Sequence, residues 1–430
     1  MTVLLYAPSL AGHPQVYCRV LGDILLERGC RVVIAAGCPE RPWPREWHDL
    51  RPFAGHGGVQ LVDCRRYAAA GQADLAAEEL RRLQQDHAVD VTLFIEADHF
   101  RREFARIAEG AAPRLRGRTV GIFARACQWC PGEDYYTGEP LSRFAPTLRG
   151  NLGRLKRRLL DRYAFDRPFF EEALLRRRAV DAVIVKDERV TERFGPPVYW
   201  MPEIYKVFGS APDDEEESEW TEFADRYRAW RAGRGPERIA LYFGEGRWYK
   251  GYDYFLRLLE LEPEASGVHA GKDYVVAQAP FEFDVEAALA TLRREGRLFE
   301  TRRYVQSQKL IDLFFESIDR WVSTHRYPIS SGTMLQALEL GKPVLTHGNG
   351  LLGWRVRTYG LGATYRRGDV EDLRRQWRAF REEPAARYAE AIRGFMAKFT
   401  RERVAAMFLS VLLGDSGTGR AGAVSAGKET

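Results

Sequence analysis

The 430-residue sequence lacks any apolar run of about 18 residues, the length that a membrane-spanning helix needs. Its first residues, MTVLLYAPSLAGH, enter an apolar segment at once and have no basic region before a long apolar stretch, so a secretory signal peptide is not expected. The net charge is also small, since 65 basic and 60 acidic residues leave +5. This balance does not indicate nucleic-acid binding. We therefore expect a cytoplasmic protein without a nucleic-acid partner.

Cysteine is scarce and shows no disulfide pattern. The six cysteines all lie in the first third of the chain: Cys18, Cys30, Cys38, Cys64, Cys127 and Cys130. None has the paired spacing of a disulfide framework, so a reducing compartment fits best. The segment CQWC at 127–130 has the form of half a zinc site or a redox pair, but no second CxxC or histidine pair follows at ligand spacing. We expect ordinary thiols and no metal.

Internal repeats of about 20 to 50 residues are absent, so a solenoid is not indicated. The sequence instead alternates strand-like and helix-like segments. TVLLYAP, a small-residue loop, VYCRVLGDILLERG and RVVIAAG read as strand, loop, helix and strand, and such βαβ units build parallel sheets. A chain of 430 residues is too long for one ordinary core, which indicates two domains with a cleft between them.

Changes in composition predict the domain boundaries. A first α/β domain covers residues 1–205, and the acidic run SAPDDEEESEW marks a linker region over 206–235. The alternation restarts at RIALYF, so we expect a second α/β domain over 236–385. Apolar periodicity then predicts terminal helices over 386–413. The small, polar tail at 414–430 is expected to be disordered.

One stretch of the second domain, YFGEGRWYKGYDYF, concentrates glycine and positive charge after a predicted strand. Chemistry on parallel sheets lies beyond the carboxyl ends of the strands. Gly244 and Gly246 allow a ligand to approach the backbone, and Gly251 leaves room at the following helix. Arg247 and Lys250 are close enough in sequence to converge on one dianionic group. A diphosphate is the expected ligand, and an exposed turn whose cations face water is the alternative.

A second anion-binding pattern follows in SSGTMLQALELGKPVL. Ser330, Ser331, Gly332 and Thr333 precede a helix with apolar periodicity, so hydroxyl and backbone N–H groups gather at its positive end. GKPVL then begins a strand, and THGNGLLG forms the loop after it. Helix capping alone explains the serines. Their order relative to the arginine and lysine motif indicates a phosphate site.

These segments resemble the group-one glycosyltransferases, also called glycosyltransferase family 4. FGEGRWYKGYD is similar to the family's FGxxRxxKGxD form, and SSGTMLQALELGKPVL is similar to its SGxxxxALxxGxPV form. GLLGWRVRTYGLGATYRRGDVEDL and AGHPQVYCRVLGDILLERGCRVVIA are similar to its sugar-end loop and its N-terminal glycine loop. The resemblance implies the GT-B fold, an α/β architecture of two facing Rossmann-like domains with parallel sheets and a cleft between them. The first domain would bind the acceptor and the second the nucleotide-sugar donor.

The resemblance also implies roles for individual residues. Arg247 and Lys250 would act in catalysis by holding the donor diphosphate. The implied donor-binding residues are Gly12, Gly244, Gly246, Gly251, Ser331, Gly332 and Thr333. The chain departs from the family at Pro328 and Gln336, where many members carry glutamates. This departure puts in doubt a carboxylate that would hold the sugar ring or the ribose.

A polar cluster in the first domain is the candidate acceptor site. His13 lies in the first loop, and Glu96, Asp98 and His99 close the predicted strand VTLFIEADHF at its carboxyl end. Arg125 ends the strand RTVGIFAR. We expect His99 to be the catalytic histidine, with His13, Asp98 and Arg125 binding the acceptor. Ordinary hydrogen-bonded loop side chains are the alternative for each of these residues.

The resemblance implies transfer of a hexose-type sugar from a nucleotide-diphosphate donor to an acceptor hydroxyl, with retention, front-side attack and neither metal nor cofactor. The acceptor stays open between a glycan, a lipid-linked molecule and a small molecule. A non-hydrolysing nucleotide-sugar epimerase and a retired sugar-nucleotide-binding protein are the alternatives. The basic segment RGNLGRLKRRLLDRY indicates either a packed amphipathic helix or, more weakly, membrane association.

Overall fold

The computed structural model describes residues 1–8, 13–37, 50–64, 73–123, 170–208, 214–273, 281–305, 307–326 and 330–414. Several features discussed above lie outside these ranges: Gly12, Arg125, Cys38, Cys127, Cys130, Pro328, the basic segment 149–163, the tail from residue 415 and the side chain of His13. Among the helices in the described ranges, none combines the length and the apolar character that crossing a membrane requires.

The described residues form two compact units. The first contains those of Met1–Ala126, Ala164–Phe208 and Phe399–Thr430, and the second contains those of Gly209–Lys398. The acidic segment expected as a linker carries helix α7, Asp214–Arg231, which packs on the second unit's helix α10 and strand β10. The expected terminal helices are divided, because α14 belongs to the second unit and α15 to the first.

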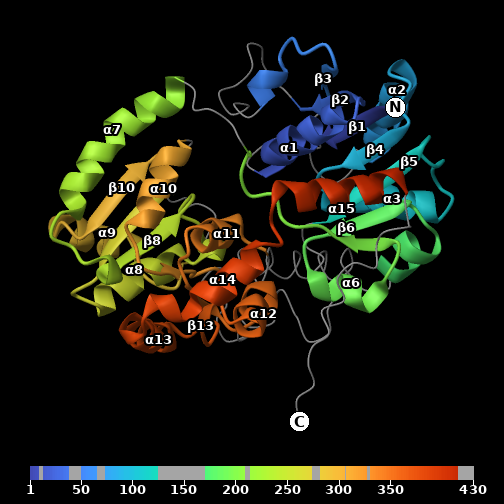
Figure 1. Cartoon of the computed structure of the whole chain (residues 1–430). Helices are drawn as coiled ribbons and strands as arrows, with labels where there is room; N and C mark the ends of the chain where they lie inside the picture. Colours follow the sequence, from blue (N-terminus) through green and yellow to red (C-terminus); the bar gives the residue numbers. More distant parts are fainter. Residues whose placement is uncertain are drawn as a thin grey trace. The chain divides into compact units, whose positions relative to one another are not determined.

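The first unit is built on a seven-stranded parallel sheet in the order β3-β2-β1-β4-β5-β6-β7 (Figure 1). Its strands are β1 Thr2–Ala7, β2 Arg31–Ala36, β3 Val59–Asp63, β4 Val91–Phe94, β5 Arg118–Phe123, β6 Ala182–Val185 and β7 Val198–Trp200. Its helices are α1 His13–Glu27, α2 Ala73–Asp86, η2 Ala97–Phe100, α3 Arg101–Ala108, η4 Phe170–Arg176, α6 Glu188–Phe194 and α15 Arg401–Leu413. The strand order reverses between β1 and β4, and this reversal is where doubly wound sheets bind ligands.

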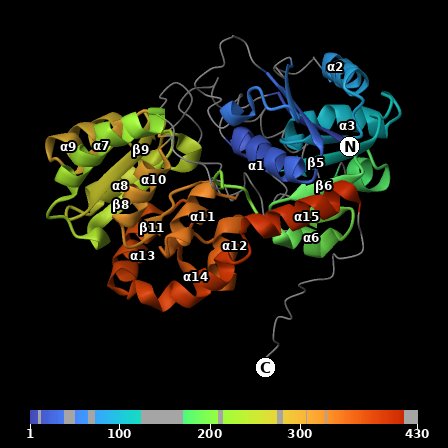
Figure 2. The same ribbon diagram turned by 45° about the horizontal axis from the view of Figure 1, so that its top comes forward.

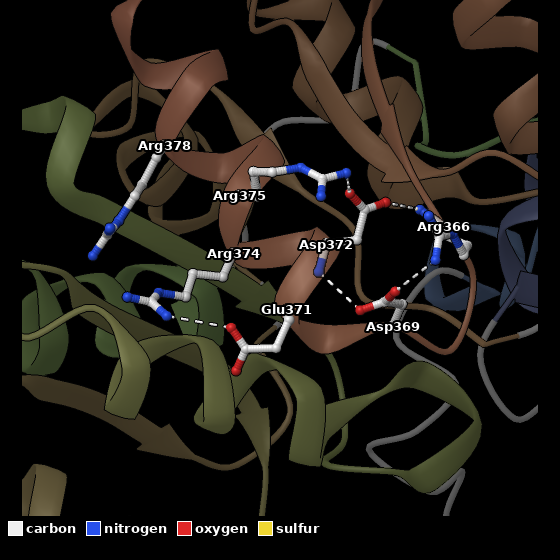
Figure 3. Close-up of a pocket in the computed structure, with 7 residues that line it drawn as sticks. All are labelled: Arg366, Asp369, Glu371, Asp372, Arg374, Arg375 and Arg378. Atoms are coloured by element: carbon white, nitrogen blue, oxygen red, sulfur yellow. Dashed lines mark hydrogen bonds and ion pairs between the residues drawn. The ribbon is translucent and has the colours of Figure 1, made fainter.

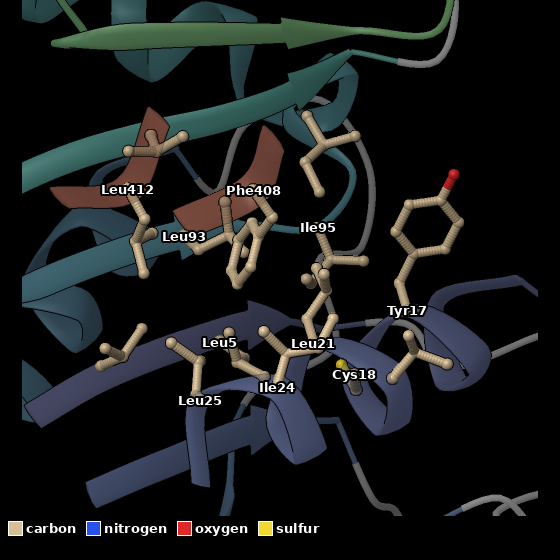
Figure 4. Packing of buried hydrophobic residues seen from close by; sticks show 14 of the residues in the cluster. Leu5, Tyr17, Cys18, Leu21, Ile24, Leu25, Leu93, Ile95, Phe408 and Leu412 are labelled. Carbon is tan, nitrogen blue, oxygen red and sulfur yellow. The ribbon is translucent and has the colours of Figure 1, made fainter. Parts of the chain in front are cut away.

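The C-terminal helix α15 completes the core of the first unit. Its residues Phe408 and Leu412 are fully buried and pack with Leu5 and Leu93 of the sheet and with Leu21 of α1 (Figure 4). Both views of the chain place α15 beside β6 (Figures 1 and 2). The first unit therefore needs a segment from the far end of the chain to bury one face of its sheet.

The cysteines within the described ranges agree with the expectation of ordinary thiols. Cys18, Cys30 and Cys64 are buried and free. Burial raises the pKa of the Cys18 and Cys64 thiols, which keeps them protonated and weakly nucleophilic. Cys127 and Cys130 lie outside the described residues.

The second unit repeats the strand order of the first. Its strands are β8 Ile239–Phe243, β9 Ser266–Lys272, β10 Leu298–Arg302, β11 Trp321–Val322, β12 Val344–His347 and β13 Gly362–Tyr365. They form two parallel three-stranded sheets, β10-β9-β8 and β11-β12-β13, and β8 lies next to β11. The succession is therefore 10-9-8-11-12-13, and the order reverses between β8 and β11.

Helices connect these strands and pack on one another. Besides α7, they are η5 Pro236–Arg238, η6 Trp248–Lys250, α8 Tyr252–Leu261, α9 Val285–Arg294, α10 Gln308–Glu316, α11 Gly332–Glu339, α12 Gly350–Tyr359, α13 Val370–Glu382, η8 Ala385–Tyr388 and α14 Ala389–Met396. Helix α14 packs against α11 and α12, as both views show (Figures 1 and 2).

A buried histidine fixes the turn that follows β8. His269, fully buried on β9, lies with Nε2 3.1 Å from the Gly244 carbonyl oxygen and with Nδ1 3.0 Å from the Tyr252 hydroxyl. Because a carbonyl only accepts, Nε2 donates to it, and Nδ1 accepts from the tyrosine. A side chain at Gly271 would place its β-carbon 2.0 Å from the same Gly244 oxygen. The backbone of Gly244 is thus held against β9.

Truncation of the α15 anchor should destabilise the first unit. We expect Phe408→Ala to lower the free energy of unfolding by about 3 to 5 kcal/mol, because it leaves a cavity in a closed core. Arg403→Ala, at an exposed position of the same helix, is the control and should change it by less than about 0.5 kcal/mol. Urea unfolding followed by circular dichroism measures both variants. Equal small effects would show that α15 does not hold this core together.

Acid should weaken the fold through the same buried histidine. Burial lowers the pKa of His269 from 6.5 to about 4. The unfolded chain therefore binds a proton that the native chain does not, and stability falls as the pH drops from about 7 towards 4. We expect His269 to contribute about 2 to 3 kcal/mol to that decline. Urea unfolding at pH 7 and pH 4.5 measures it, with His269→Gln as the control that removes the titration. A midpoint near 6.5 for this ring in an NMR titration of the folded protein would contradict the prediction.

Candidate functional site

The candidate donor site lies in the second unit, where the loops after β8 and β11 meet. The Thr324 hydroxyl donates to the Lys250 carbonyl over 3.1 Å, and the Arg326 amide donates to the Tyr249 carbonyl over 2.9 Å. Gly251 has the left-handed φ of +67°, and a side chain there would place its β-carbon 1.8 Å from the Thr324 carbonyl oxygen. The glycine is therefore required both by the backbone conformation and by this close contact.

The β8 loop carries two cations, Arg247 and Lys250, and only Arg247 forms an ion pair with the described residues. Arg247 is held by the Glu245 carboxylate, with Nε 2.6 Å and Nη2 2.5 Å from Oε2. Within the described part of the chain, the partly buried ammonium of Lys250 has neither a hydrogen-bond acceptor nor an ion pair. Burial lowers the pKa of Lys250, the Arg247 cation lowers it further, and Glu245 opposes the shift. A bound anion would relieve both unfavourable effects on Lys250.

Glycine at position 244 makes room for this lysine. Gly244 has φ of +108°, and a side chain there would place its β-carbon 2.5 Å from Lys250 Nζ. Gly246 is buried beside it, and its amide donates to the Lys272 carbonyl over 3.3 Å. The structure thus brings together the predicted residues Gly244, Lys250 and Arg247. It adds Glu245, which no sequence pattern had marked as part of the site.

A buried ion-pair network lies beside the β8 loop and holds it in place. Arg326 and the fully buried Asp253 form an ion pair of 2.6 Å, and Arg326 also pairs with Glu282. The guanidinium lies 4.1 Å from the centroid of the Tyr254 ring and 5.2 Å from that of Trp248. The sequence signal for Asp253 was its place in the GYD end of the motif, but nothing in the sequence pointed to its arginine partner.

The other predicted donor residues lie at the start of α11. Ser331 is the N-cap, and its hydroxyl oxygen accepts from the Met334 amide over 3.4 Å. Gly332 and Thr333 form the first turn, where backbone N–H groups point out of the helix. Capping thus accounts for Ser331, and the amides of the first turn are the groups suited to bind phosphate. Gln336, at the position of a family glutamate, is half-buried on the same helix.

The candidate acceptor residues that the structure describes lie after β4, at the strand reversal of the first unit. His99 Nε2 lies 3.2 Å from Glu96 Oε2, and the two side chains are 52% and 36% exposed. Asp98 is buried, and its carbonyl accepts from Arg101 Nε over 2.6 Å. The structure therefore groups His99 with Glu96 and leaves Asp98 little access to a ligand. His13 begins α1.

A charged cluster that was not predicted from the sequence lies at the carboxyl end of β6. Lys186 directly follows this strand, and its Nζ lies 3.5 Å from Glu203 Oε1 and 4.7 Å from the centroid of the Tyr17 ring. All three residues are buried. A lysine closing an apolar strand was the only sequence signal. The cluster ties α1 to the segment after β7.

A second charged site is a cavity of about 440 Å³ that lies along α13 (Figure 3). Its lining residues are Arg366, Asp369, Glu371, Asp372, Arg374, Arg375 and Arg378. Each of the four arginines is paired with a carboxylate, as in the 3.2 Å contact of Arg374 with Glu371. Because its cations are already neutralised, this cavity is a weaker anion site than the surroundings of Lys250.

No family model and no curated protein sequence matches the chain. Among solved structures, it is similar to HepE from Anabaena in complex with UDP and glucose, with a TM-score of 0.60, 14% identity and coverage of 96% of this chain and 100% of that one. For sucrose-phosphate synthase from Thermosynechococcus elongatus the values are 0.57, 14%, 96% and 97%. For a glycosyltransferase from Rickettsia africae ESF-5 they are 0.60, 12%, 96% and 97%.

These likenesses extend over nearly the whole length of each chain, and they agree with the strand order found in both units. The expected fold class is thereby confirmed: the chain has the α/β GT-B fold, built of two Rossmann-like units with parallel sheets.

Proposed function

We propose that the chain is a glycosyltransferase that moves a sugar from a nucleotide-diphosphate donor to an acceptor hydroxyl. The observation that carries the proposal is the ammonium of Lys250. It is partly buried, has no counter-ion among the described residues, and lies close enough to Arg247 for the two charges to interact. Glu245 offsets one of these two positive charges, so a net positive charge remains at the loop, and a bound anion would lower its free-energy cost. A diphosphate is such an anion.

The place of these cations in the fold supports the same ligand. They follow β8 at the strand reversal of the second unit, where α/β sheets bind nucleotides. Helix α11 is the next helix in the chain after the neighbouring β11, and it packs on β12. Among the structurally similar proteins, HepE binds UDP-glucose. The second unit is accordingly the proposed donor-binding part of the chain.

In the proposed reaction the bond between the anomeric carbon and the diphosphate breaks while a bond to the acceptor oxygen forms. Negative charge grows on the leaving diphosphate, and Lys250, Arg247 and the α11 amides stabilise it. Retention with front-side attack, as the family resemblance implies, is part of the proposal. So is a role for exposed His99, which with Glu96 would hydrogen-bond an acceptor or sugar hydroxyl. No metal or cofactor is required besides the nucleotide sugar.

A turnover assay with a panel of nucleotide sugars tests the proposal. Free nucleoside diphosphate should appear only when an acceptor is present, and the panel of acceptors should include glycans, lipid-linked molecules and small alcohols. NMR of the product gives the anomeric configuration. An isomerised nucleotide sugar without acceptor would indicate an epimerase instead. Binding without any turnover would indicate a retired site.

Removal of either cation should cripple transfer and leave the fold intact. We expect Lys250→Ala and Arg247→Ala each to lower kcat by about 100-fold to 1,000-fold, because each removes a preorganised contact to the leaving group. Lys309→Ala is the matched control, since this exposed lysine forms a 2.8 Å surface ion pair with Glu217. Steady-state kinetics measure all three variants. Normal turnover and nucleotide affinity in both cation variants would refute the proposed diphosphate site.

Chelation should not stop the reaction. The two cations of the β8 loop provide the charge that a divalent ion would otherwise supply to the diphosphate. We therefore expect turnover to be unchanged, within about two-fold, after dialysis against EDTA, since this is a small effect compared with the loss of a preorganised donor. Rates with added Mg²⁺ and Mn²⁺ are the control. Loss of activity that one of these ions restores would reject the metal-free mechanism.

A further inference from the structure

The His325 side chain stands where the loops after β8 and β11 join. Its two chain neighbours both bind the β8 loop, Thr324 at the Lys250 carbonyl and Arg326 at the Tyr249 carbonyl. The ring is half-buried and close enough to the Lys250 ammonium for the two to interact electrostatically. His325 is thus fixed beside the cation that the proposed function requires.

Ser323 sets the proton arrangement of this ring. Its hydroxyl oxygen lies 3.0 Å from His325 Nδ1, and Ser323 is buried. Within the described ranges the hydroxyl has no other acceptor, so the hydrogen bond that satisfies it is the one it donates to Nδ1. Nδ1 is then the acceptor of the neutral imidazole, and the ring proton resides on Nε2.

The ring stays neutral in this position. Burial, together with smaller contributions from Lys250 and His347, lowers the pKa of His325 from 6.5 to about 3. His347 comes from β12, and its Nδ1 accepts from the Asn349 amide at 3.3 Å. Protonation of His325 would therefore place a third positive charge beside Lys250 and Arg247. A neutral donor avoids that repulsion and still offers an N–H group.

Two donors consequently lie together without an acceptor. Within the described residues, neither the Nε2–H group of His325 nor the ammonium of Lys250 has a hydrogen-bond acceptor. Both residues are half-buried, so these donors are accessible to a ligand or to water, either of which satisfies them. An anion whose oxygens accept several hydrogen bonds fits this arrangement.

We propose that His325 binds the donor diphosphate as a neutral hydrogen-bond donor through Nε2–H, next to Lys250, with Ser323 holding the tautomer. This assignment rests on the proposed glycosyltransferase function and adds a diphosphate-binding residue to it. His325 would contact the leaving group directly, whereas Ser323 is a positioning residue.

Binding of nucleoside diphosphates to full-length variants tests the inference. The probe is whichever of UDP, GDP, ADP and dTDP binds the wild-type chain most tightly, measured by isothermal titration calorimetry. His325→Phe keeps the ring volume and removes the N–H group, so we expect affinity to fall about 10-fold to 100-fold. His325→Gln keeps an N–H donor and should recover affinity to within about 5-fold of wild type. His56→Phe, an exposed histidine of the first unit, is the matched control and should bind normally.

Ser323→Ala distinguishes the positioning role from direct contact. Without the hydroxyl the ring is free to place its proton on either nitrogen, so we expect affinity to fall several-fold, less than in His325→Phe. ¹⁵N NMR of the wild-type imidazole should show the Nε2–H tautomer, and the diphosphate should shift the Nε2 signal. This spectrum tests the inference even if a variant fails to fold.

The outcomes separate the inference from the proposed function. If Lys250→Ala weakens diphosphate binding and His325→Phe does not, His325 is no ligand and the proposed function stands. If neither variant changes binding, the diphosphate site itself is misplaced. An Nδ1–H tautomer in the NMR spectrum would also overturn the assignment.

Discussion

The buried ion pair between Asp253 and Arg326 is the constraint on which the geometry of the candidate donor site depends. Removing two charges from water is expensive, and only close, well-oriented contacts offset that cost. Here the 2.6 Å contact is backed by Glu282 and by the Tyr254 ring, so the guanidinium is held on several sides. The pair joins α8 to the segment after β11. The positions of Lys250 and His325 follow from that junction.

The two cations of the β8 loop have unequal support, and this difference has a chemical meaning. Arg247 is oriented and partly neutralised by Glu245, whereas Lys250 is left with a depressed pKa. Because the Lys250 ammonium forms no ion pair with the described residues, no such contact has to break when an anionic ligand binds it, and the group is in this sense preorganised. Arg247 is oriented by its carboxylate, and its side chain remains 36% exposed. The arginine thus contributes orientation, and the lysine contributes most of the unsatisfied charge.

Local signals predicted the fold class from the sequence, and they also predicted the grouping of residues in the loop after β8. The Gly244 to Gly251 loop was readable because glycine, arginine and lysine occur together after an apolar strand, and the capping role of Ser331 followed from its place before a periodic helix. The pair Asp253–Arg326 was not readable, since its members are far apart in sequence and joined only by the strand order. The packing of α15 on the sheet of the first unit could not be predicted for the same reason, since α15 is far in sequence from these strands. The role of His325 was not readable either, because the sequence does not show the Ser323 contact that fixes the position of its ring proton.

The return of α15 to the first unit affects how the protein is made. The second unit, from 209 to 398, is inserted between two parts of the first, and Phe408 closes the first core only after that insertion. Domains ordinarily fold in order as the ribosome releases them. Helix α1 covers part of one apolar face of the sheet that begins at Thr2, and the part that α15 covers stays exposed until α15 has left the exit tunnel. The unit that is synthesised first is therefore the one that is finished last.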